Sequence, residues 1–254
     1  MQVPIKYRNG IPLFYEKSSE EYRLDPYERF DPMVIRQSMI HLCDQLWENY
    51  SFGSVLRFVD DHISVSRDMN ILEIGCGVGR MIADFANRFP TANCWGIDYS
   101  YQMLKRAKEV WIDGKSIEVD LSRFGFDKDI IVSGLSLTNL SFGLAKCESL
   151  PFEDGSQDVV FSSFLFDRLD DPLHGLIEMI RVLKSEGILL LVTPFNFTKS
   201  NNWDRFYPNN KFRKVLEYLK LNIIDWQEDL LVEEPLDRHG NTIRWRCQGI
   251  VLKK

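Results

Sequence analysis

Short apolar runs and helically spaced apolar positions alternate along the middle of this chain. The short runs lie at residues 71–74, 94–97, 159–161 and 188–192, and helix-like patterns occur at 81–86, 101–107 and 176–183. Short continuous apolar runs are typical of strands buried in a parallel sheet, and the helices are the crossovers that parallel strands need. The pattern predicts an α/β fold, with a mostly parallel sheet and helices on both of its faces.

Three further segments flank or interrupt this alternation. Residues 1–66 precede the predicted core, 67–254, and contain a helical stretch at 33–47. An insertion at about 113–138 exceeds an ordinary connection and contains two strand-like runs, at 117–121 and 130–134. Near the end of the chain, 222–226 and 244–252 read as two strands joined by a turn around Gly240.

A glycine-rich turn follows the first strand and carries the most specific motif of the chain. Gly75, Gly77 and Gly79 stand directly before the helical pattern at 81–86. Glycines let the backbone turn sharply and approach a ligand closely, and the following helix points its free N–H groups at the turn. The turn therefore predicts a small-molecule cradle, although glycines needed only for tight packing would give the same local pattern.

Two classes of cofactor use such a cradle. Dinucleotide-binding enzymes need the spacing G-x-G-x-x-G, and here Arg80 stands at the position of the third glycine. This argues against an NAD-dependent oxidoreductase, which stays an alternative. Asp98 ends the second strand, where a carboxylate can accept hydrogen bonds from ribose hydroxyls, and Ser100 can cap the next helix. A loop or helix-capping aspartate is the competing interpretation of Asp98.

Four motifs in order resemble the class I S-adenosylmethionine-dependent methyltransferases. They are the glycine turn with Glu73 two residues before it, the segments 96–104 and 148–152, and the strand-to-helix segment 157–172. The resemblance implies a Rossmann-like sheet of seven strands with the last one antiparallel, and S-adenosyl-L-methionine as cofactor with S-adenosyl-L-homocysteine as product. It also implies a small-molecule methyl acceptor and an N-terminal extension, 1–66, that closes over the site as a lid or simply packs on the sheet.

The same resemblance assigns roles in cofactor binding. Glu73 would order the glycine loop and its contact with the cofactor's ammonium group, Asp98 would hold the ribose, and Cys147 would offer its backbone N–H to adenine. Lys146 departs from the pattern, because the family has an acid there and a lysine cannot accept a hydrogen bond from the adenine amino group. The expected cofactor-binding residues are Glu73, Gly75, Cys76, Gly77, Gly79, Asp98, Tyr99, Met103, Lys146, Cys147, Glu148, Ser162, Ser163, Phe164 and Arg168.

Composition and charge argue against several other classes. The net charge of −6 disfavours long nucleic acid as a partner, because phosphate binding needs a basic face. No apolar run approaches the roughly 20 residues of a membrane span, and the first residues lack the apolar centre of a signal peptide. Five cysteines without a C-x-x-C pair and four histidines without a shared spacing predict neither disulfides nor a metal site. We expect a cytoplasmic protein, and the sequence does not indicate its oligomeric state.

A second, shorter resemblance concerns the acceptor. Its residues are Asp167-Arg168-Leu169, Pro172, Thr193-Pro194-Phe195, Trp203 and the segment 238–245. They resemble the methyltransferases that N-methylate mercaptohistidine in ovothiol-type pathways, which implies an imidazole or amino-acid-like acceptor. Asp167 would then be catalytic, orienting or deprotonating the imidazole, and Arg168 or Arg244 would hold a carboxylate. A plain ion pair between Asp167 and Arg168 is the competing interpretation, and a non-catalytic cofactor-binding subunit is the alternative function.

Overall fold

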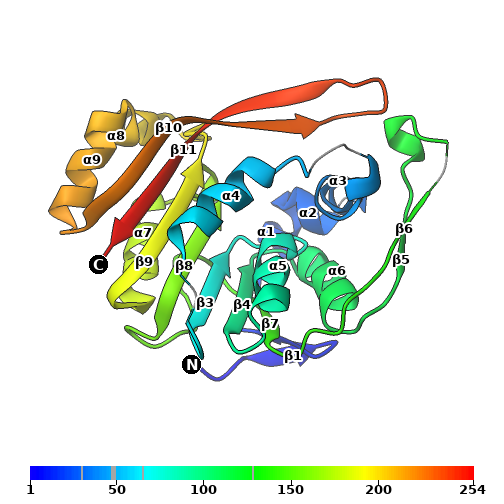
Figure 1. The fold of residues 1–254 in the computed structure, drawn as a ribbon, viewed down its shortest axis with the longest axis horizontal. Helices are drawn as coiled ribbons and strands as arrows, with labels where there is room; N and C mark the ends of the chain where they lie inside the picture. The colour runs from blue at the N-terminus through cyan, green and yellow to red at the C-terminus, as the bar shows by residue number, and fades with distance from the viewer. Residues whose placement is uncertain (30, 47–49, 65, 128) are drawn as a thin grey trace.

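The computed structural model describes residues 1–29, 31–46, 50–64, 66–127 and 129–254, which form a layered α/β structure around one large sheet (Figure 1). Its strand order is β1-β2-β7-β4-β3-β8-β9-β11-β10. The strands are β1 (Lys6–Arg8), β2 (Ile11–Leu13), β3 (Asn70–Ile74), β4 (Asn93–Asp98), β7 (Leu140–Leu144), β8 (Gln157–Ser163), β9 (Leu183–Thr193), β10 (Asn222–Pro235) and β11 (Thr242–Lys253). The predicted insertion contains a separate antiparallel pair, β5 (Ile117–Val119) and β6 (Ile130–Val132).

Helices cover both faces of the sheet, as the sequence pattern predicts. Successive residues of β3 point to opposite sides. Ile71 therefore packs in the core beneath α5 (Arg80–Arg88) and α6 (Tyr101–Trp111), and Leu72 packs in the core beneath α7 (Pro172–Val182). The helices are α1 (Ser19–Leu24), α2 (Pro26–Arg29), α3 (Asp31–Leu42), α4 (Gly53–His62), α5 (Arg80–Arg88), α6 (Tyr101–Trp111), α7 (Pro172–Val182), α8 (Ser200–Phe206) and α9 (Asn209–Tyr218), with short 3-10 turns η1 (Asp44–Leu46), η2 (Ser122–Phe124) and η3 (Phe166–Arg168). Among the described residues, no helix has the length and apolar character needed to cross a bilayer.

The seven predicted core strands are confirmed. β7, β4, β3, β8 and β9 run parallel to one another, and β11 is antiparallel to both β9 and β10. Consequently the carboxyl ends of the parallel strands meet at one edge of the sheet. That edge carries the glycine turn after β3 and Asp98 at the end of β4.

The sheet is wider than predicted, because two strands of the N-terminal extension join it. β2 pairs in parallel with the edge strand β7, Leu13 opposite Leu144, and β1 pairs with β2. Both apolar residues of β2, Ile11 and Leu13, are buried. A run of three residues is too short for periodicity to identify it as a strand. The extension is therefore partly continuous with the core sheet.

Two element boundaries also differ from the prediction. The helix expected at 33–47 begins at Asp31 and ends at Leu42, where η1 follows, and Trp47 lies outside the described residues. β9 begins at Leu183, before the apolar run 188–192 that predicts it, and directly at the end of the helix-like pattern 176–183. Glu186 there has φ 66°, so the irregular residues belong to the strand as a local distortion.

The long β10–β11 hairpin (hereafter the hairpin) reaches over the carboxyl edge of the sheet, where the N-terminal helices also lie (Figure 1). Ser54 of α4 donates to the carbonyl of Leu231 at 2.7 Å, and Arg36 of α3 forms an ion pair with Glu234. Near the turn of the hairpin, the N–H of Arg238 donates to the carbonyl of Phe124 in the insertion. The extension, the insertion and the hairpin thus form a common roof over this edge.

Candidate cofactor and active site

The glycine turn has the backbone conformation for which glycine is needed. Gly75, Gly77 and Gly79 have φ of 77°, 53° and 76°, which is the left-handed region that costs other residues about 1–2 kcal/mol. The N–H of Gly75 donates to the carbonyl of Ile97 at 2.8 Å, and the indole of Trp111 donates to the carbonyl of Val78. These bonds fix the turn between β4 and α6, so contacts within the chain hold the shape of the cradle.

The last two glycines of the turn face different surroundings. A Cβ at Gly77 would meet no atom within 4 Å, so this glycine borders open space. A Cβ at Gly79 would lie 2.6 Å from the ring of Phe142 and 3.1 Å from Ala107. Gly79 is therefore required for packing, whereas the space beside Gly77 leaves room for the predicted close approach of a ligand.

Alanine substitutions are expected to separate these two roles. Gly77→Ala should cost about 1–2 kcal/mol of stability from backbone strain alone, yet weaken S-adenosylhomocysteine binding about tenfold or more, because the new methyl occupies the cradle. Gly79→Ala should cost about 2–5 kcal/mol of stability, since overpacking adds to the same strain. Chemical denaturation and calorimetric titration measure the two effects. Equal losses of stability in both variants would contradict this assignment.

Glu73 is buried beneath the start of α5. Its side chain, 2% exposed, accepts a hydrogen bond from the N–H of Ile82 at 3.0 Å. The residue preceding this helix is Gly79, which has no side chain to cap it, so Glu73 supplies that acceptor from the neighbouring strand. Burial raises the pKa of this carboxyl well above its ordinary value, with smaller contributions from Asp98 and Asp84. Ordering of the loop is the role these contacts support, and a contact with the cofactor's ammonium group stays a prediction.

Asp98 links the first two motifs. One carboxylate oxygen accepts from the N–H of Gly77 at 2.8 Å, and the other accepts from the N–H of Ser100 at 2.7 Å. Burial raises its pKa, and these two bonds and the charge of Lys17 oppose that shift. Ser100 caps α6 as expected, because its hydroxyl accepts from the N–H of Met103. Each oxygen of Asp98 has further acceptor capacity for a ribose hydroxyl.

The remaining expected residues divide into buried and accessible ones. The side chains of Cys76, Met103, Cys147 and Ser162 are buried. The Ser162 hydroxyl donates to the carbonyl of Ile74 at 2.8 Å, which fastens β8 to the end of β3. Ser163, Glu148 and Tyr99 are half-buried at the carboxyl edge. Buried side chains leave only their backbone for ligand contacts.

Phe164 follows β8 in a strained conformation and supports the roof. Its φ is 56°, uncommon for a bulky residue and frequent at functional sites. Its ring lies 5.1 Å from that of Phe52 and 5.9 Å from that of Trp245, measured between centroids. The next residue, Leu165, lies against Gly75. Phe164 thus connects the glycine turn region to both the extension and the hairpin.

Lys146 lies at the expected place after β7, but its partner comes from the extension. Its ammonium forms an ion pair with Glu21 at 2.7 Å and lies 4.3 Å from the centre of the Tyr15 ring. The Tyr15 hydroxyl donates to the same carboxylate, and the ring of Tyr15 lies 5.8 Å from that of Tyr99. These extension residues are absent from the predicted site. The capping-box spacing Ser18-x-x-Glu21 was a usable sequence pattern, but it predicts only a helix start.

Asp167 and Arg168 form η3 directly after β8. The Asp167 side chain is fully buried, and Oδ1 accepts from the Thr193 hydroxyl at 3.0 Å. Its Oδ2 lies 3.6 Å from Nε of Arg168, and among the described residues this oxygen has no hydrogen-bond partner. Burial raises the pKa of Asp167, and Arg168 and Thr193 oppose the shift. The side chain of Arg168 is 40% exposed, so it is accessible to a ligand while that of Asp167 is not.

Arg80 has a structural role. Its guanidinium makes two hydrogen bonds of 2.8 Å with Asp44 and one of 2.9 Å with Asp84. Tyr50 lies beside it, with the guanidinium 4.6 Å from the ring centre. A pocket of about 320 Å³ borders Tyr50 and Ser51 on one side and the hairpin on the other. Arg80 therefore fixes the extension against the first turn of α5, next to an opening in the roof.

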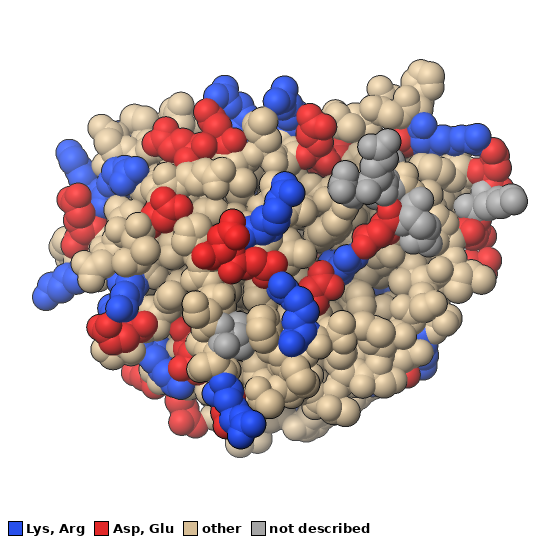
Figure 2. Space-filling view, viewed as in Figure 1, with Lys and Arg blue, Asp and Glu red and all other residues tan. Residues whose placement is uncertain are grey.

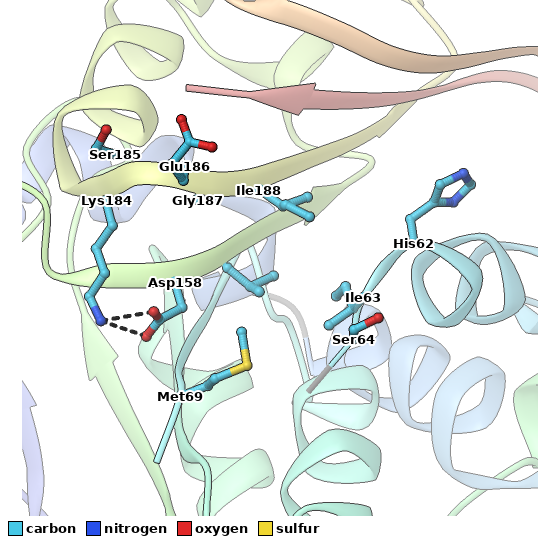
Figure 3. A pocket seen from close by; sticks show the side chains of 11 residues that line it. His62, Ile63, Ser64, Met69, Asp158, Lys184, Ser185, Glu186, Gly187 and Ile188 are labelled. Atoms are coloured by element: carbon cyan, nitrogen blue, oxygen red, sulfur yellow. Dashed lines mark hydrogen bonds and ion pairs between the residues drawn. The ribbon is translucent and has the colours of Figure 1, made fainter. Parts of the chain in front are cut away.

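Three further features of the molecule lie outside the proposed site: an aromatic cluster, a second pocket and the charged surface. The rings of Phe195, Phe197, Phe206 and Phe212 are buried, so this cluster is core packing and not an open aromatic pocket. A second pocket, around Asp158 and its partner Lys184, lies at the amino ends of β8 and β9 (Figure 3). Figure 2 shows both charge signs interspersed over the described part of one face, without an extended basic surface there.

Comparison with known proteins agrees with this geometry. Residues 72–191 match the family described as Methyltransferase domain. The ubiquinone/menaquinone biosynthesis C-methyltransferase UbiE of Geotalea uraniireducens (strain Rf4) is 30% identical over 54% of this chain and 52% of its own. The malonyl-[acyl-carrier protein] O-methyltransferase of Hahella chejuensis is 28% identical over 52% of this chain and 39% of its own. The chain thus spans about half, or less, of these curated relatives.

A solved structure shares the fold over more of the chain. The S-adenosylmethionine-dependent methyltransferase from Aquifex aeolicus superimposes with a TM-score of 0.51 over 88% of this chain and 98% of its own, at 19% identity. At that identity the likeness concerns the fold alone. The sequence matches, the strand order and the glycine turn with Asp98 point to one family. Over residues 72–191 the chain is similar to the Methyltransferase domain family, and this match includes the segments that resemble the class I S-adenosylmethionine-dependent methyltransferases.

Proposed function

We propose that this protein transfers a methyl group from S-adenosylmethionine to a small acceptor that carries a carboxylate beside a nucleophilic nitrogen, of the imidazole or amino-acid type. One observation carries the acceptor class. The partly exposed side chain of Arg168 stands at the carboxyl edge of the sheet, with Nε 3.6 Å from the buried carboxylate of Asp167. A guanidinium held in this way can bind a carboxylate in bidentate fashion.

The residues present fit the cofactor. The open side of Gly77 suits the amino-acid end and Asp98 suits the ribose. The backbone of Cys147 suits adenine, because Cys147 follows Lys146, whose ammonium lies 5.6 Å from the centre of the Tyr99 ring. The bound cofactor would supply an electrophilic methyl carbon. The chain's own contribution is then to align an acceptor with that carbon and exclude water, which can account for roughly 7–11 kcal/mol of the barrier. The roof is also consistent with a small acceptor. It consists of elements of this same chain, and these elements cover the carboxyl edge where the acceptor would bind.

Asp167 is best proposed as a positioning residue. Its carboxylate is fully buried and bonded to Thr193, so in this conformation it does not reach an acceptor. It lies close enough to Arg168 to orient the guanidinium. A direct role in deprotonating an imidazole stays a prediction that would require Asp167 to become exposed. We also propose a cytoplasmic location, which the five free and buried cysteines support.

The acceptor proposal predicts a selective effect of Arg168→Met. For an imidazole amino acid such as mercaptohistidine, the KM should rise about 10- to 150-fold, because a charge-assisted hydrogen bond contributes roughly 1.5–3 kcal/mol. For the decarboxylated amine of the same acceptor, the KM should change little. Transfer of labelled methyl from S-adenosylmethionine measures both.

Arg244→Met is the matched control, since Arg244 is an exposed arginine of the hairpin. An equal loss with both acceptors would refute the carboxylate role, and a loss in Arg244→Met alone would transfer that role to Arg244. If the protein binds S-adenosylhomocysteine but methylates no acceptor of this class, the non-catalytic cofactor-binding subunit becomes the better description.

A further inference from the structure

The residues that meet Lys146 belong to a stretch that crosses the nucleoside end of the site. Residues 14–28 (hereafter the N-terminal segment) run from the edge of β7, where the N–H of Phe14 donates to the carbonyl of Leu144, toward the start of α6. There Glu28 accepts from the N–H of Tyr101 at 2.6 Å. The segment thus covers the ends of β7 and β4. Asp98 is the last residue of β4, and Lys146 follows the end of β7 by two residues.

A buried ion cluster holds the middle of the N-terminal segment. The side chain of Lys17 has no exposed surface, and its ammonium contacts Asp25 at 2.6 Å and Glu28 at 3.1 Å. The same ammonium lies 3.9 Å from the centre of the Tyr99 ring. Tyr99 directly follows Asp98, so the N-terminal segment lies against the wall where the proposed cofactor site would receive its nucleoside.

Glu21 attaches this segment to the core through Lys146. Its two oxygens receive the ammonium of Lys146 at 2.7 Å, the hydroxyl of Tyr15 at 2.7 and 2.8 Å, and the N–H of Ser18 at 2.8 Å. These donors hold the pKa of Glu21 far below its ordinary value, so it is ionised at neutral pH. With its acceptor sites occupied in this way, Glu21 is not available to replace the missing acid opposite an adenine amino group.

We propose that the Glu21–Lys146 ion pair is a latch that keeps the N-terminal segment closed over the nucleoside end of the cofactor site. Lys146 then acts as a positioning residue. It stands where related enzymes have a base-contacting acid, and it binds the covering segment instead of the base. This inference rests on the proposed function, because it assumes that the nucleoside of S-adenosylmethionine lies between Tyr99 and Cys147.

The latch is tested by a double-mutant cycle on S-adenosylhomocysteine affinity, measured by calorimetry. Glu21→Gln keeps an acceptor for the Ser18 N–H and removes the charge, and Lys146→Met keeps the length. Each single variant should weaken binding about three- to tenfold. Exposed ion pairs contribute little free energy on their own, but Glu21 also accepts hydrogen bonds from Tyr15 and Ser18. The double variant should be no weaker than the worse single variant, and Lys146→Arg should retain the wild-type affinity within about twofold. Effects that multiply in the double variant would overturn the latch.

Lys146→Glu distinguishes the latch from the alternative that residue 146 contacts the adenine base directly, as the acid at this position does in the family. The latch requires this variant to bind at least as weakly as Lys146→Met, because two carboxylates would repel each other. A direct contact with adenine would instead make it bind more tightly, since it restores the family's acid. Tryptic cleavage after Lys17 and Arg23 in the ligand-free protein should accelerate in the same variants that lose affinity. Unchanged cleavage would overturn the proposal.

Lys184→Met provides a matched control at the opposite edge of the sheet (Figure 3). Its ion pair with Asp158 is similarly exposed, 40% and 24% against 34% and 29% for Lys146 and Glu21. It should leave both affinity and cleavage after Lys17 unchanged. Failure of the wild-type protein to bind S-adenosylhomocysteine would refute the proposed function. Wild-type binding with unchanged affinity in Glu21→Gln and Lys146→Met would refute only the latch.

Discussion

Replacement of Asp98 by alanine is expected to weaken S-adenosylhomocysteine binding at least roughly a hundredfold. Hydrogen bonds to a charged group contribute about 1.5–3 kcal/mol each, and two ribose hydroxyls would lose theirs. The substitution also removes the acceptor of the Gly77 N–H, so the cradle itself loses a constraint. Calorimetric titration of the folded variant measures the loss.

Two further variants distinguish ligand binding from folding. Asp98→Asn keeps the shape and one acceptor oxygen, so its affinity should fall between those of the wild type and Asp98→Ala. Asp158→Ala removes a carboxylate that likewise accepts a backbone N–H, that of Asn70, at the far edge of the sheet. This control should lose stability without losing affinity. Unchanged affinity in Asp98→Ala would exclude the ribose role.

Glu73→Gln is expected to become more stable relative to the wild type as the pH rises. The folded-state pKa of Glu73 lies well above the ordinary value because of burial. Below the ordinary pKa, both folded and unfolded states hold the proton. Above it, the unfolded chain releases the proton first, so Glu73 lowers the stability of the wild type by about 1.4 kcal/mol per pH unit until the folded pKa is reached. Glutamine does not titrate and still offers an oxygen to the Ile82 N–H.

Urea denaturation of both proteins at several pH values between 5 and 8 measures this difference. Contributions of all other titrating groups cancel in the comparison, because the two proteins share them. A difference in unfolding free energy that stays constant over this range would show that Glu73 ionises normally in the folded state. Glu73→Ala serves as the second variant, and it should be less stable than Glu73→Gln throughout, because it leaves the Ile82 N–H without an acceptor.

The core of the fold could be predicted because its determinants are local. Strand β3, the glycine turn and α5 follow one another within 19 residues, 70–88, and each step has a specific requirement of residue type. Asp98 was identified for the same reason, since its position at the end of a short apolar strand and before the capping Ser100 is visible in the sequence. The seven core strands and the antiparallel direction of the last one then followed from the family resemblance.

The walls of the site could not be predicted, because their contacts join distant parts of the chain. Lys146 meets Glu21 across 125 positions, and neither residue type nor spacing indicates such a pair. The family pattern even suggested a base contact at Lys146. Asp167 shows a related difficulty, because a carboxylate in a motif can be buried behind the arginine beside it. Burial and long-range partners are properties of the assembled fold, and periodicity does not encode them.

The roof also has a consequence for the order in which the site can form during synthesis. Arg36 of α3 and its partner Glu234 of the hairpin are separated by 198 positions. At ribosomal speeds of about 5–20 residues per second, Arg36 would wait roughly 10–40 s for its partner. A nascent chain could already contain the glycine turn and Asp98, and so bind a cofactor, well before the hairpin completes the roof over the site. Cofactor capture during translation would precede catalytic competence.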